Sequence, residues 1–290
     1  MENVTYIVSS VVVFSFVIML LVIMLMVAAK KLVPQGLAKL NINEGSRELE
    51  VKPGASLLTA LSTQKIFLPS ACGGGGTCAM CKCKVLEGGG ELLPTEAGQV
   101  TKAEAKEGVR LACQLKVKED MVLDIEPEIL DIKKYECTVR SNHNVATFIK
   151  ELVVELPKGE KLDFRAGGYI QIDVPAYKDL SYKSFEVEDE YRGDWDQFNL
   201  WDCVANNDED CFRAYSMASF PLEDDIIMLN IRIASPPPGT SYPPGICTSY
   251  TFNLKPGDKI TISGPYGEFF AQETDRQMCF IGGRAGMAPM

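Results

Sequence analysis

The sequence predicts an α+β and all-β multidomain chain, in which a transmembrane helix precedes a small α+β domain and a larger β-rich domain. Three patterns predict this: an uncharged apolar run near the N-terminus, a glycine- and cysteine-rich loop among short strands, and alternating apolar strands beyond residue 134. The 290 residues, 46% of them hydrophobic, suffice for two modest folded domains. A net charge of -10 argues against a nucleic-acid binder, which normally has a basic face.

The first predicted element is a transmembrane helix over residues 4–29. This run has no charged side chain, and as a helix it rises roughly 39 Å, which exceeds the ~30 Å hydrocarbon core of a membrane. A cleaved signal peptide is the alternative, but such peptides begin with basic residues, whereas here the only charged residue before the run is Glu2. Lys30 and Lys31 follow it, and basic residues stay cytoplasmic. We therefore expect a retained single-pass anchor with the rest of the chain in the cytoplasm.

The next segment predicts the small α+β domain. Leu37–Val51 has the pattern of two short strands around a turn at Glu44-Gly45. Ser56 is a candidate N-cap for a short leucine-rich helix, and Met121–Ile125 is a candidate closing strand. Residues 126–134 are a candidate linker.

Five of the ten cysteines predict a metal centre in this domain. Cys72, Cys78 and Cys81 form C-x5-C-x2-C beside four consecutive glycines, and Cys113 stands apart. This is close to the C-x4-C-x2-C and distant cysteine of plant-type ferredoxins, so it predicts a [2Fe–2S] cluster held by these four thiolates. Cys83 competes with Cys81 for a ligand place, and the spacing favours Cys81. Zinc is the other candidate metal for a C-x2-C pair, but the glycines and the isolated fourth cysteine argue against it.

The single histidine, His143, excludes a Rieske-type centre, which needs two histidines on one iron. The remaining cysteines are scattered, and we expect each to be a buried apolar thiol.

Beyond residue 134 the pattern predicts a β-barrel or sandwich. Residues 169–174 and 226–233 alternate or run apolar, with proline and glycine between strands. Residues 177–211 are acidic and aromatic without a clear strand pattern, which predicts an inserted loop. The loop either docks partner subunits through its aromatic side chains or is a solvated loop with a small core of its own.

Two short motifs in the β-rich part are candidate flavin-binding elements. In the first, Arg213, Tyr215 and Ser216 offer a partner for a pyrophosphate, a ring to stack on a flavin, and a hydroxyl for its reactive edge. In the second, small residues and hydroxyls open a predicted helix, whose N-terminus readily binds a phosphate. These residues are Gly245, Cys247, Thr248 and Ser249.

The last residues predict the first βα turn of a nucleotide-binding domain. Met278–Ile281 reads as a buried strand that enters a turn containing Gly283 and Gly286. Arg284 occupies the first glycine place of the usual G-x-G-x-x-P pattern. It either accommodates a cofactor phosphate or points to solvent, and we favour the second. A domain begins here, and we expect the sequence to be a fragment of a longer protein.

The order and wording of these motifs resemble the F subunits of Na+-translocating NADH:quinone oxidoreductases. The resemblance runs through essentially the whole chain and is carried by the anchor and by ACGGGGTCAMCKCKV, RLACQ, FRAGGYIQI, YRGDWDQFNLW, RAYSMAS, IRIASPPP, KPGDKITISGPYGEFF and FIGGRAGMAPM. It implies a β-grasp 2Fe-2S ferredoxin-like domain over residues 36–130 and a ferredoxin-reductase-type FAD-binding β-barrel over 134–272. Residues 276–290 begin an NADH-binding domain.

The resemblance also implies roles for residues. Arg213 contacts the FAD pyrophosphate, Tyr215 packs on the isoalloxazine, and Ser216 lies near its N5, so the last two are the implied catalytic residues. The implied pyrophosphate neighbours are Gly245, Cys247, Thr248 and Ser249. The implied NADH neighbours are Gly283 and Gly286.

The implied activity is electron input to a bacterial inner-membrane pump. NADH reduces FAD, and single electrons pass through the [2Fe–2S] cluster to membrane subunits that reduce ubiquinone and export Na+. Two other functions remain open: a membrane-tethered reductase that serves an oxygenase, and an anchored ferredoxin-type carrier without flavin. The carrier needs none of Arg213, Tyr215 and Ser216.

Overall fold

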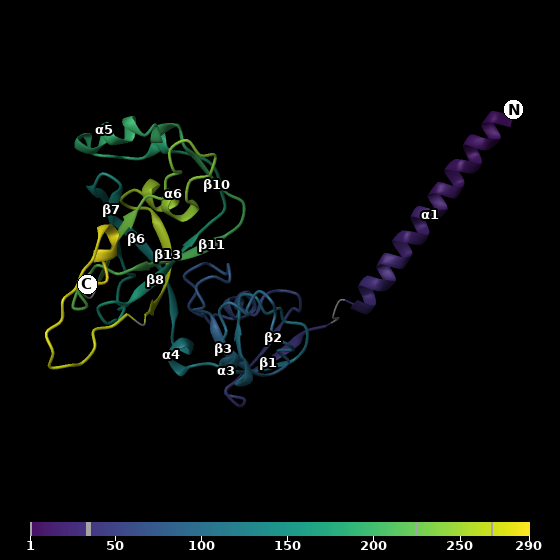
Figure 1. Cartoon of the computed structure of the whole chain (residues 1–290), viewed down its shortest axis with the longest axis horizontal. Helices are drawn as coiled ribbons and strands as arrows, with labels where there is room; N and C mark the ends of the chain where they lie inside the picture. Colours follow the sequence, from purple (N-terminus) through teal and green to yellow (C-terminus); the bar gives the residue numbers. More distant parts are fainter. Residues whose placement is uncertain (1, 33–35, 224, 268) are drawn as a thin grey trace. The chain divides into compact units, whose positions relative to one another are not determined.

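The computed structural model describes residues 2–32, 36–223, 225–267 and 269–290 (Figure 1). The described chain divides into two compact units. The first unit comprises Met1–Gln64 and Lys82–Ile125, and the second comprises Lys65–Cys81 and Glu126–Met290. The segment Lys65–Cys81, called the cluster loop segment below, therefore packs with the β-rich part of the chain.

Helix α1 (Glu2–Leu32) is the long N-terminal helix, purple in Figure 1. Its stretch Ser9–Val27 has a mean hydropathy of 3.1 and packs against no other described part of the chain. Large apolar side chains such as Phe14 and Met24 are exposed. A helix that is apolar on every face is stable when lipid surrounds it, so its length and composition suit α1 to crossing a membrane.

The first unit is built on a five-stranded sheet of order β2-β1-β5-β3-β4. β1 and β5 run parallel, and the other neighbours run antiparallel. The elements are β1 (Ala38–Ile42), β2 (Arg47–Val51), α2 (Leu57–Thr63), β3 (Lys82–Glu87), α3 (Lys102–Lys106), β4 (Val109–Leu111) and β5 (Met121–Asp124). The predicted cap is present, because the Ser56 hydroxyl accepts a hydrogen bond from Thr59 N at 3.2 Å. The predicted α+β domain is confirmed.

A buried ion pair fixes the loop between β3 and β4. Arg110 is 4% exposed and Glu96 is fully buried, and Arg110 Nη2 lies 2.6 Å from Glu96 Oε2. The carboxylate also accepts hydrogen bonds from Leu93 N (2.9 Å) and Leu111 N (2.8 Å). Burial alone raises the pKa of Glu96, but these donors outweigh it and hold that pKa below its ordinary value. The loop is thereby tied to the strand that leads to Cys113.

The second unit is built on a six-stranded antiparallel sheet of order β11-β8-β13-β6-β7-β12. Its strands are β6 (Lys133–Ala146), β7 (Ile149–Glu155), β8 (Tyr169–Val174), β11 (Cys211–Ser216), β12 (Ile226–Arg232) and β13 (Lys259–Tyr266). Among the described residues, the edge strands β11 and β12 pair only beyond the end of β11, where Met217 pairs with Leu229. The ladders thus leave the sheet open instead of closing the expected barrel.

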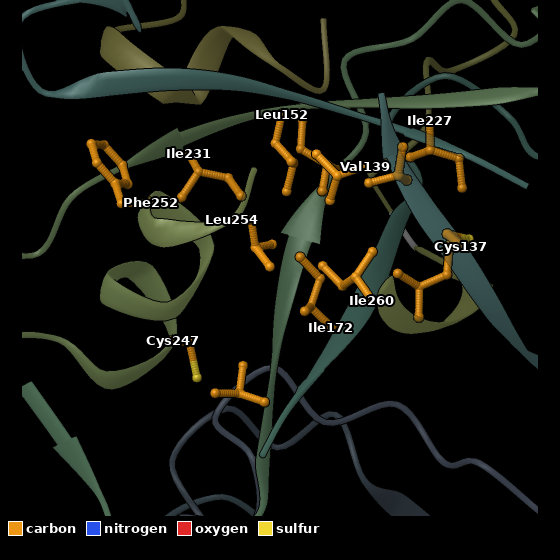
Figure 2. Close-up of a cluster of buried hydrophobic side chains, with 14 of the residues drawn as sticks. Cys137, Val139, Leu152, Ile172, Ile227, Ile231, Cys247, Phe252, Leu254 and Ile260 are labelled. Carbon is orange, nitrogen blue, oxygen red and sulfur yellow. The ribbon is translucent and has the colours of Figure 1, made fainter. Parts of the chain in front are cut away.

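One apolar core fills this sheet, and Figure 2 shows part of it. Side chains of the five strands β6, β7, β8, β12 and β13 meet the last turn of α6 (Ile246–Asn253) and the residue after it. The labelled members include Val139, Leu152, Ile172, Ile227, Ile231, Phe252, Leu254 and Ile260. Short helix α4 (Pro127–Leu130) precedes the sheet in the predicted linker.

The acidic, aromatic insert is folded, contrary to the expectation of a loop. It contains β9 (Tyr177–Ser181), η1 (Tyr182–Ser184), α5 (Asp189–Gln197), η2 (Leu200–Asp202) and β10 (Val204–Asn207), with β9 and β10 paired. Tyr182 and Trp195 are fully buried, and Trp195 Nε1 donates to Thr147 O at 2.7 Å. Phe185 packs on Tyr182 with ring centroids 4.5 Å apart. These aromatic rings therefore belong to the core of the second unit and do not form an exposed docking surface.

The predicted strand Met278–Ile281 is absent from the structure. These residues have no strand pairing, and Ile281 is 85% exposed. A strand is held by ladder hydrogen bonds to neighbours, and the described residues supply no neighbour here. The glycine turn that follows contains a short helix, η3 (Arg284–Met287), and the Arg284 side chain lies outside the described residues.

Removing the buried carboxylate should destabilise the first unit. We expect Glu96→Ala to lower the free energy of unfolding by about 3–5 kcal/mol, because it leaves Arg110 charged and buried without its partner. Since the folded pKa of Glu96 is lowered, its contribution is present above the ordinary carboxyl pKa and is lost as pH falls through the folded value. Urea unfolding at neutral pH, followed by circular dichroism, measures the change. The exposed control Glu119→Ala should alter it by less than about 0.5 kcal/mol, and equal stabilities for both variants would contradict the role of the ion pair.

Candidate functional site

Glycine gives the cluster loop segment its tight path. Gly73, Gly74 and Gly76 have φ values of 63°, 91° and 73°, in the region that L side chains rarely adopt. The buried hydroxyl of Ser70 accepts a hydrogen bond from Gly74 N at 3.0 Å. The backbone therefore turns sharply between the first two predicted ligands, as a loop that wraps a cluster requires.

Cys72 and Cys78 lie side by side, with their sulfurs 3.4 Å apart. Burial opposes ionisation of Cys72, but hydrogen bonds from Thr77 and Cys78 outweigh it and hold the pKa of its thiol at about 6. Two sulfurs on one tetrahedral metal lie roughly 3.8 Å apart when each bond is ~2.3 Å. This pair therefore fits two thiolate ligands of one iron.

The other predicted ligands are Cys81, which is 1% exposed, and Cys113, which is half-buried. Among the described residues no three or more metal-ligating side chains converge on one point. A [2Fe–2S] cluster does not need such a group, because each of its irons takes two protein ligands and two bridging sulfides. The donor set fits this cluster better than a four-ligand zinc site. All four ligands stay predictions.

Cys83, the competitor of Cys81, has a different environment. It lies on β3, is 7% exposed and belongs to the first unit. Burial raises the pKa of its thiol to about 12, so at neutral pH it is protonated. Cys81, in contrast, ends the cluster loop segment that also carries Cys72 and Cys78, which agrees with the spacing argument for Cys81.

The first flavin motif lies on the edge strand β11. Arg213, Tyr215 and Ser216 pair with Ile172, Ile170 and Tyr169 of β8. All six residues of β11 are half-buried, without the alternation of a strand that faces solvent on one side. Both faces of β11 are therefore partly covered, and neither is fully buried, which leaves room for a bound cofactor.

Arg213 carries a positive charge that no described carboxylate pairs. Its guanidinium Nη1 donates to Phe212 O at 2.7 Å, and no carboxylate lies within ion-pair distance among the described residues. Gly73 approaches it so closely that a Cβ at this glycine would lie 1.9 Å from Nη1. A half-buried cation without a carboxylate partner fits an anionic group such as a pyrophosphate.

Helix α6 supplies a second anion-binding feature. Its N-cap residue is Gly245, and no side chain caps the helix there. The first backbone N–H groups of this eight-residue helix therefore remain available to bind an anion. A Cβ on Gly245 would lie 2.6 Å from Ala234 Cβ, so only glycine fits here. The Tyr177 hydroxyl donates to Ile246 O at 2.6 Å and holds the start of the helix. Sequence reasoning missed Tyr177, because its partner is distant along the chain.

Helix α6 packs over one face of β11. Cys211, Arg213 and Tyr215 share this face because strand side chains alternate. Cys211 Sγ lies 3.6 Å from Cys247 Sγ, and the Tyr215 side chain lies beside Thr251. Burial raises the pKa of Tyr215 well above its ordinary value, so its ring is a neutral stacking surface. Arg213 and the start of α6 thus lie on the same side of the strand.

Two predicted residues of α6 have other partners. Ser249 is fully buried, and its hydroxyl lies 2.8 Å from Tyr182 Oη and donates to Gly245 O at 2.7 Å. Thr248 Oγ1 accepts from Ala234 N at 3.1 Å. These hydroxyls fix the helix start, which leaves the backbone N–H groups as its donors.

The cluster loop segment lies on the sheet beside the flavin motif. Tyr169 Oη is 3.8 Å from Met80 Sδ, and Gln171 Nε2 donates to Leu68 O at 3.4 Å. Next to Met80 is a cavity of about 450 Å³, lined largely by aromatic and apolar side chains such as Ile129, Phe164, Tyr169, Tyr266 and Phe270. Sequence reasoning did not single out Met80 or Tyr169.

Gly283 and Gly286 lie in the short turn near the end of the described chain, where Gly286 N donates to Gly283 O at 3.0 Å. A Cβ at either glycine would meet no atom within 4 Å. The surroundings of this turn thus give no further indication of a nucleotide.

Comparison with known families agrees with this division of the chain. The family of 2Fe-2S iron-sulfur cluster binding domains matches residues 40–118, and the family of oxidoreductase FAD-binding domains matches residues 197–270. The cofactors of the chain are accordingly a [2Fe–2S] cluster and FAD. The fold is similar to that of Amycolatopsis cytochrome P450 reductase GcoB, with a TM-score of 0.52 and 24% identity over 87% of this chain and 65% of that one.

Curated relatives are similar over most of this chain. The F subunit of the Na(+)-translocating NADH-quinone reductase of Pseudomonas aeruginosa (strain UCBPP-PA14) is 57% identical over 264 residues, 91% of this chain and 64% of that protein. The F subunits of Marinomonas sp. (strain MWYL1) and Neisseria meningitidis (strain FAM18) are 54% and 53% identical over 98% of this chain, and over 69% and 70% of their own lengths. The chain thus spans about two thirds of these relatives. It belongs to the family of the F subunits of Na(+)-translocating NADH-quinone reductases.

Proposed function

We propose that the protein is the electron-input subunit of a sodium-pumping NADH:quinone oxidoreductase. It oxidises NADH at FAD and passes single electrons through its [2Fe–2S] cluster to membrane subunits, which reduce ubiquinone and export Na+. FAD supplies the link between a two-electron donor and a one-electron acceptor. Family membership supports the proposal, and the packing of the second unit is its main structural support.

The main supporting observation is the contact between the cluster loop segment and the strands that hold the flavin motif, β11 and its neighbour β8. Met80, between two predicted cluster ligands, touches Tyr169. Tyr169 pairs across the sheet with Ser216, the residue proposed for the reactive edge of the flavin. Gly73 of the same segment lies against Arg213. Three of the four proposed cluster ligands, Cys72, Cys78 and Cys81, therefore belong to the same packed unit as the residues proposed for the flavin, which favours electron transfer within the chain.

The chain's own residues divide the work of holding FAD. The guanidinium of Arg213, which has no carboxylate partner among the described residues, and the uncapped start of α6 would bind the pyrophosphate. Tyr215, neutral and half-buried, would pack on the isoalloxazine, and Ser216 would place its hydroxyl at the reactive edge. Gly245, Cys247 and Thr248 shape the start of α6, and Ser249 anchors it through Tyr182.

Cys72, Cys78, Cys81 and Cys113 would hold the cluster as two pairs of thiolates. The N–H groups of Thr77 and Cys78 favour the ionised form of Cys72 before any metal is bound. The glycines let the loop wrap around the cluster.

Helix α1 would anchor the protein in the bacterial inner membrane beside the membrane subunits that receive its electrons. Lys30 and Lys31 follow the apolar stretch, which favours a cytoplasmic location for both compact units. NADH would reach the protein from the same side, at the domain that begins with Gly283 and Gly286.

Cofactor stoichiometry tests this proposal most directly. We expect about two irons, two acid-labile sulfides and one FAD per purified chain. Dithionite reduction should produce the EPR signal of a reduced [2Fe–2S] cluster. Iron and sulfide without flavin would instead identify a ferredoxin-type carrier and overturn the proposed role in NADH oxidation.

A pair of serine substitutions tests the ligand assignment. Cys81→Ser should abolish the cluster absorbance and the labile sulfide, because it removes a thiolate ligand. Cys83→Ser should retain both and cost only about 1–2 kcal/mol of stability, because Cys83 is a buried thiol. Iron analysis on both proteins decides between the two cysteines, and the reverse result would assign the ligand to Cys83.

Substitution of Arg213 tests the flavin site. Arg213→Ala should raise the FAD dissociation constant by roughly ten- to a hundredfold, as expected for one lost charge-assisted hydrogen bond, and leave the cluster spectrum unchanged. The exposed Arg232 on the opposite edge strand provides the control, and Arg232→Ala should bind FAD normally. Equal flavin titrations for parent and Arg213→Ala would remove the assignment.

A further inference from the structure

Two cysteines outside the cluster motif have their sulfurs in contact. Cys211 begins β11 and is half-buried, and Cys247 lies in the first turn of α6 and is 5% exposed. Their Sγ atoms are 3.6 Å apart. Figure 2 shows the Cys247 side chain extending from its helix at the margin of the labelled core. Outside the cluster motif, no second pair of cysteine sulfurs is recorded in contact among the described residues.

The contact is set by secondary structure on both sides. β11 is fixed by its register with β8, and the start of α6 is held by the hydrogen bond from the Tyr177 hydroxyl to Ile246 O. A disulfide requires the two sulfurs to approach to about 2 Å. Closing the remaining gap takes a small movement of the first turn of α6 toward β11.

We propose that Cys211 and Cys247 form an oxidisable thiol pair that a hydroperoxide converts to a disulfide. The Cys211 sulfur attacks a peroxide oxygen, which breaks the O–O bond, releases the first water from hydrogen peroxide and leaves a sulfenic acid. The Cys247 sulfur then attacks the sulfenic sulfur, the S–O bond breaks and a second water leaves. Two thiols are oxidised by two electrons in total, and one peroxide is reduced to two waters.

The environments of the two thiols set this order. Burial and the neighbouring Cys211 raise the pKa of Cys247 to about 12, so Cys247 is a poor first nucleophile. Cys211 is the more exposed of the two, and a peroxide therefore reaches it first. Cys247 is already in contact with it and completes the bond.

The modification would act on the flavin site, a consequence that rests on the proposed function. Cys211 lies on the same face of β11 as Arg213, and Cys247 lies in the helix turn whose N–H groups face the proposed pyrophosphate site. Drawing these sulfurs together narrows the space between strand and helix. The oxidised protein should therefore bind FAD roughly tenfold more weakly, about the effect of one lost hydrogen bond to a charged group.

Peptide mapping tests the bond itself, independently of flavin. The full chain is treated with hydrogen peroxide, free thiols are alkylated, and tryptic peptides are analysed without reduction. We expect Gly193–Arg213 joined to Ile233–Lys259, with two hydrogens fewer than the separate peptides. Because the first peptide also contains Cys203, Cys203→Ser is the matched control and should retain the link, whereas Cys211→Ser should lose it. Absence of the link, or its survival in Cys211→Ser, would overturn the proposal.

Flavin titration of the same samples tests the consequence. Peroxide should weaken FAD binding in the parent and in Cys203→Ser, reversibly on addition of dithiothreitol, and leave Cys211→Ser unaffected. A linked protein with unchanged FAD affinity would refute the coupling of the pair to the flavin site. A chain that binds no FAD even when reduced would contradict the proposed function and leave the mapping result standing on its own.

Discussion

The packing of α6 on one face of β11 is the constraint on which the flavin side of the molecule depends. The two-residue period of the strand gives Cys211, Arg213 and Tyr215 a common face, and contacts with Cys247 and Thr251 fix the helix above it. Gly245 permits the close approach to Ala234 that this packing requires. A strand residue and a helix terminus, both suited to an anion, thereby face the same space, although they lie far apart in the sequence.

The cluster motif was predictable because its information is local. Three thiolates and the glycines among them must lie close in sequence to wrap one small cluster, so spacing alone predicts which cysteines are ligands. The choice between Cys81 and Cys83 rests on the spacing, because both side chains are buried, at 1% and 7% exposure. The α+β domain, its Ser56 cap and the main strands of the sheet also followed from local patterns of apolar residues and turns.

Features that depend on distant partners were not predictable. The insert lacks an alternation of apolar and polar residues, because its stability comes from aromatic rings that pack on Phe252 and from the hydrogen bond that Trp195 donates to Thr147. Ser249 looked like a phosphate ligand, and its pairing with Tyr182 depends on how the insert folds. Met278–Ile281 has the composition of a strand, but composition does not supply the neighbouring strand that holds it. The contacts of Met80 and Gly73 with the sheet are likewise visible only once the chain is folded.

The folded insert also determines how the protein can be observed. The chain has two tryptophans, Trp195 and Trp201, and both lie in the insert with ring centroids 5.1 Å apart. Trp195 is fully buried beside Phe252 of α6, the helix that covers the flavin strand. Intrinsic tryptophan emission is consequently a local optical probe of the insert and its neighbour α6. Unfolding of the first unit, which contains no tryptophan, would change that emission very little.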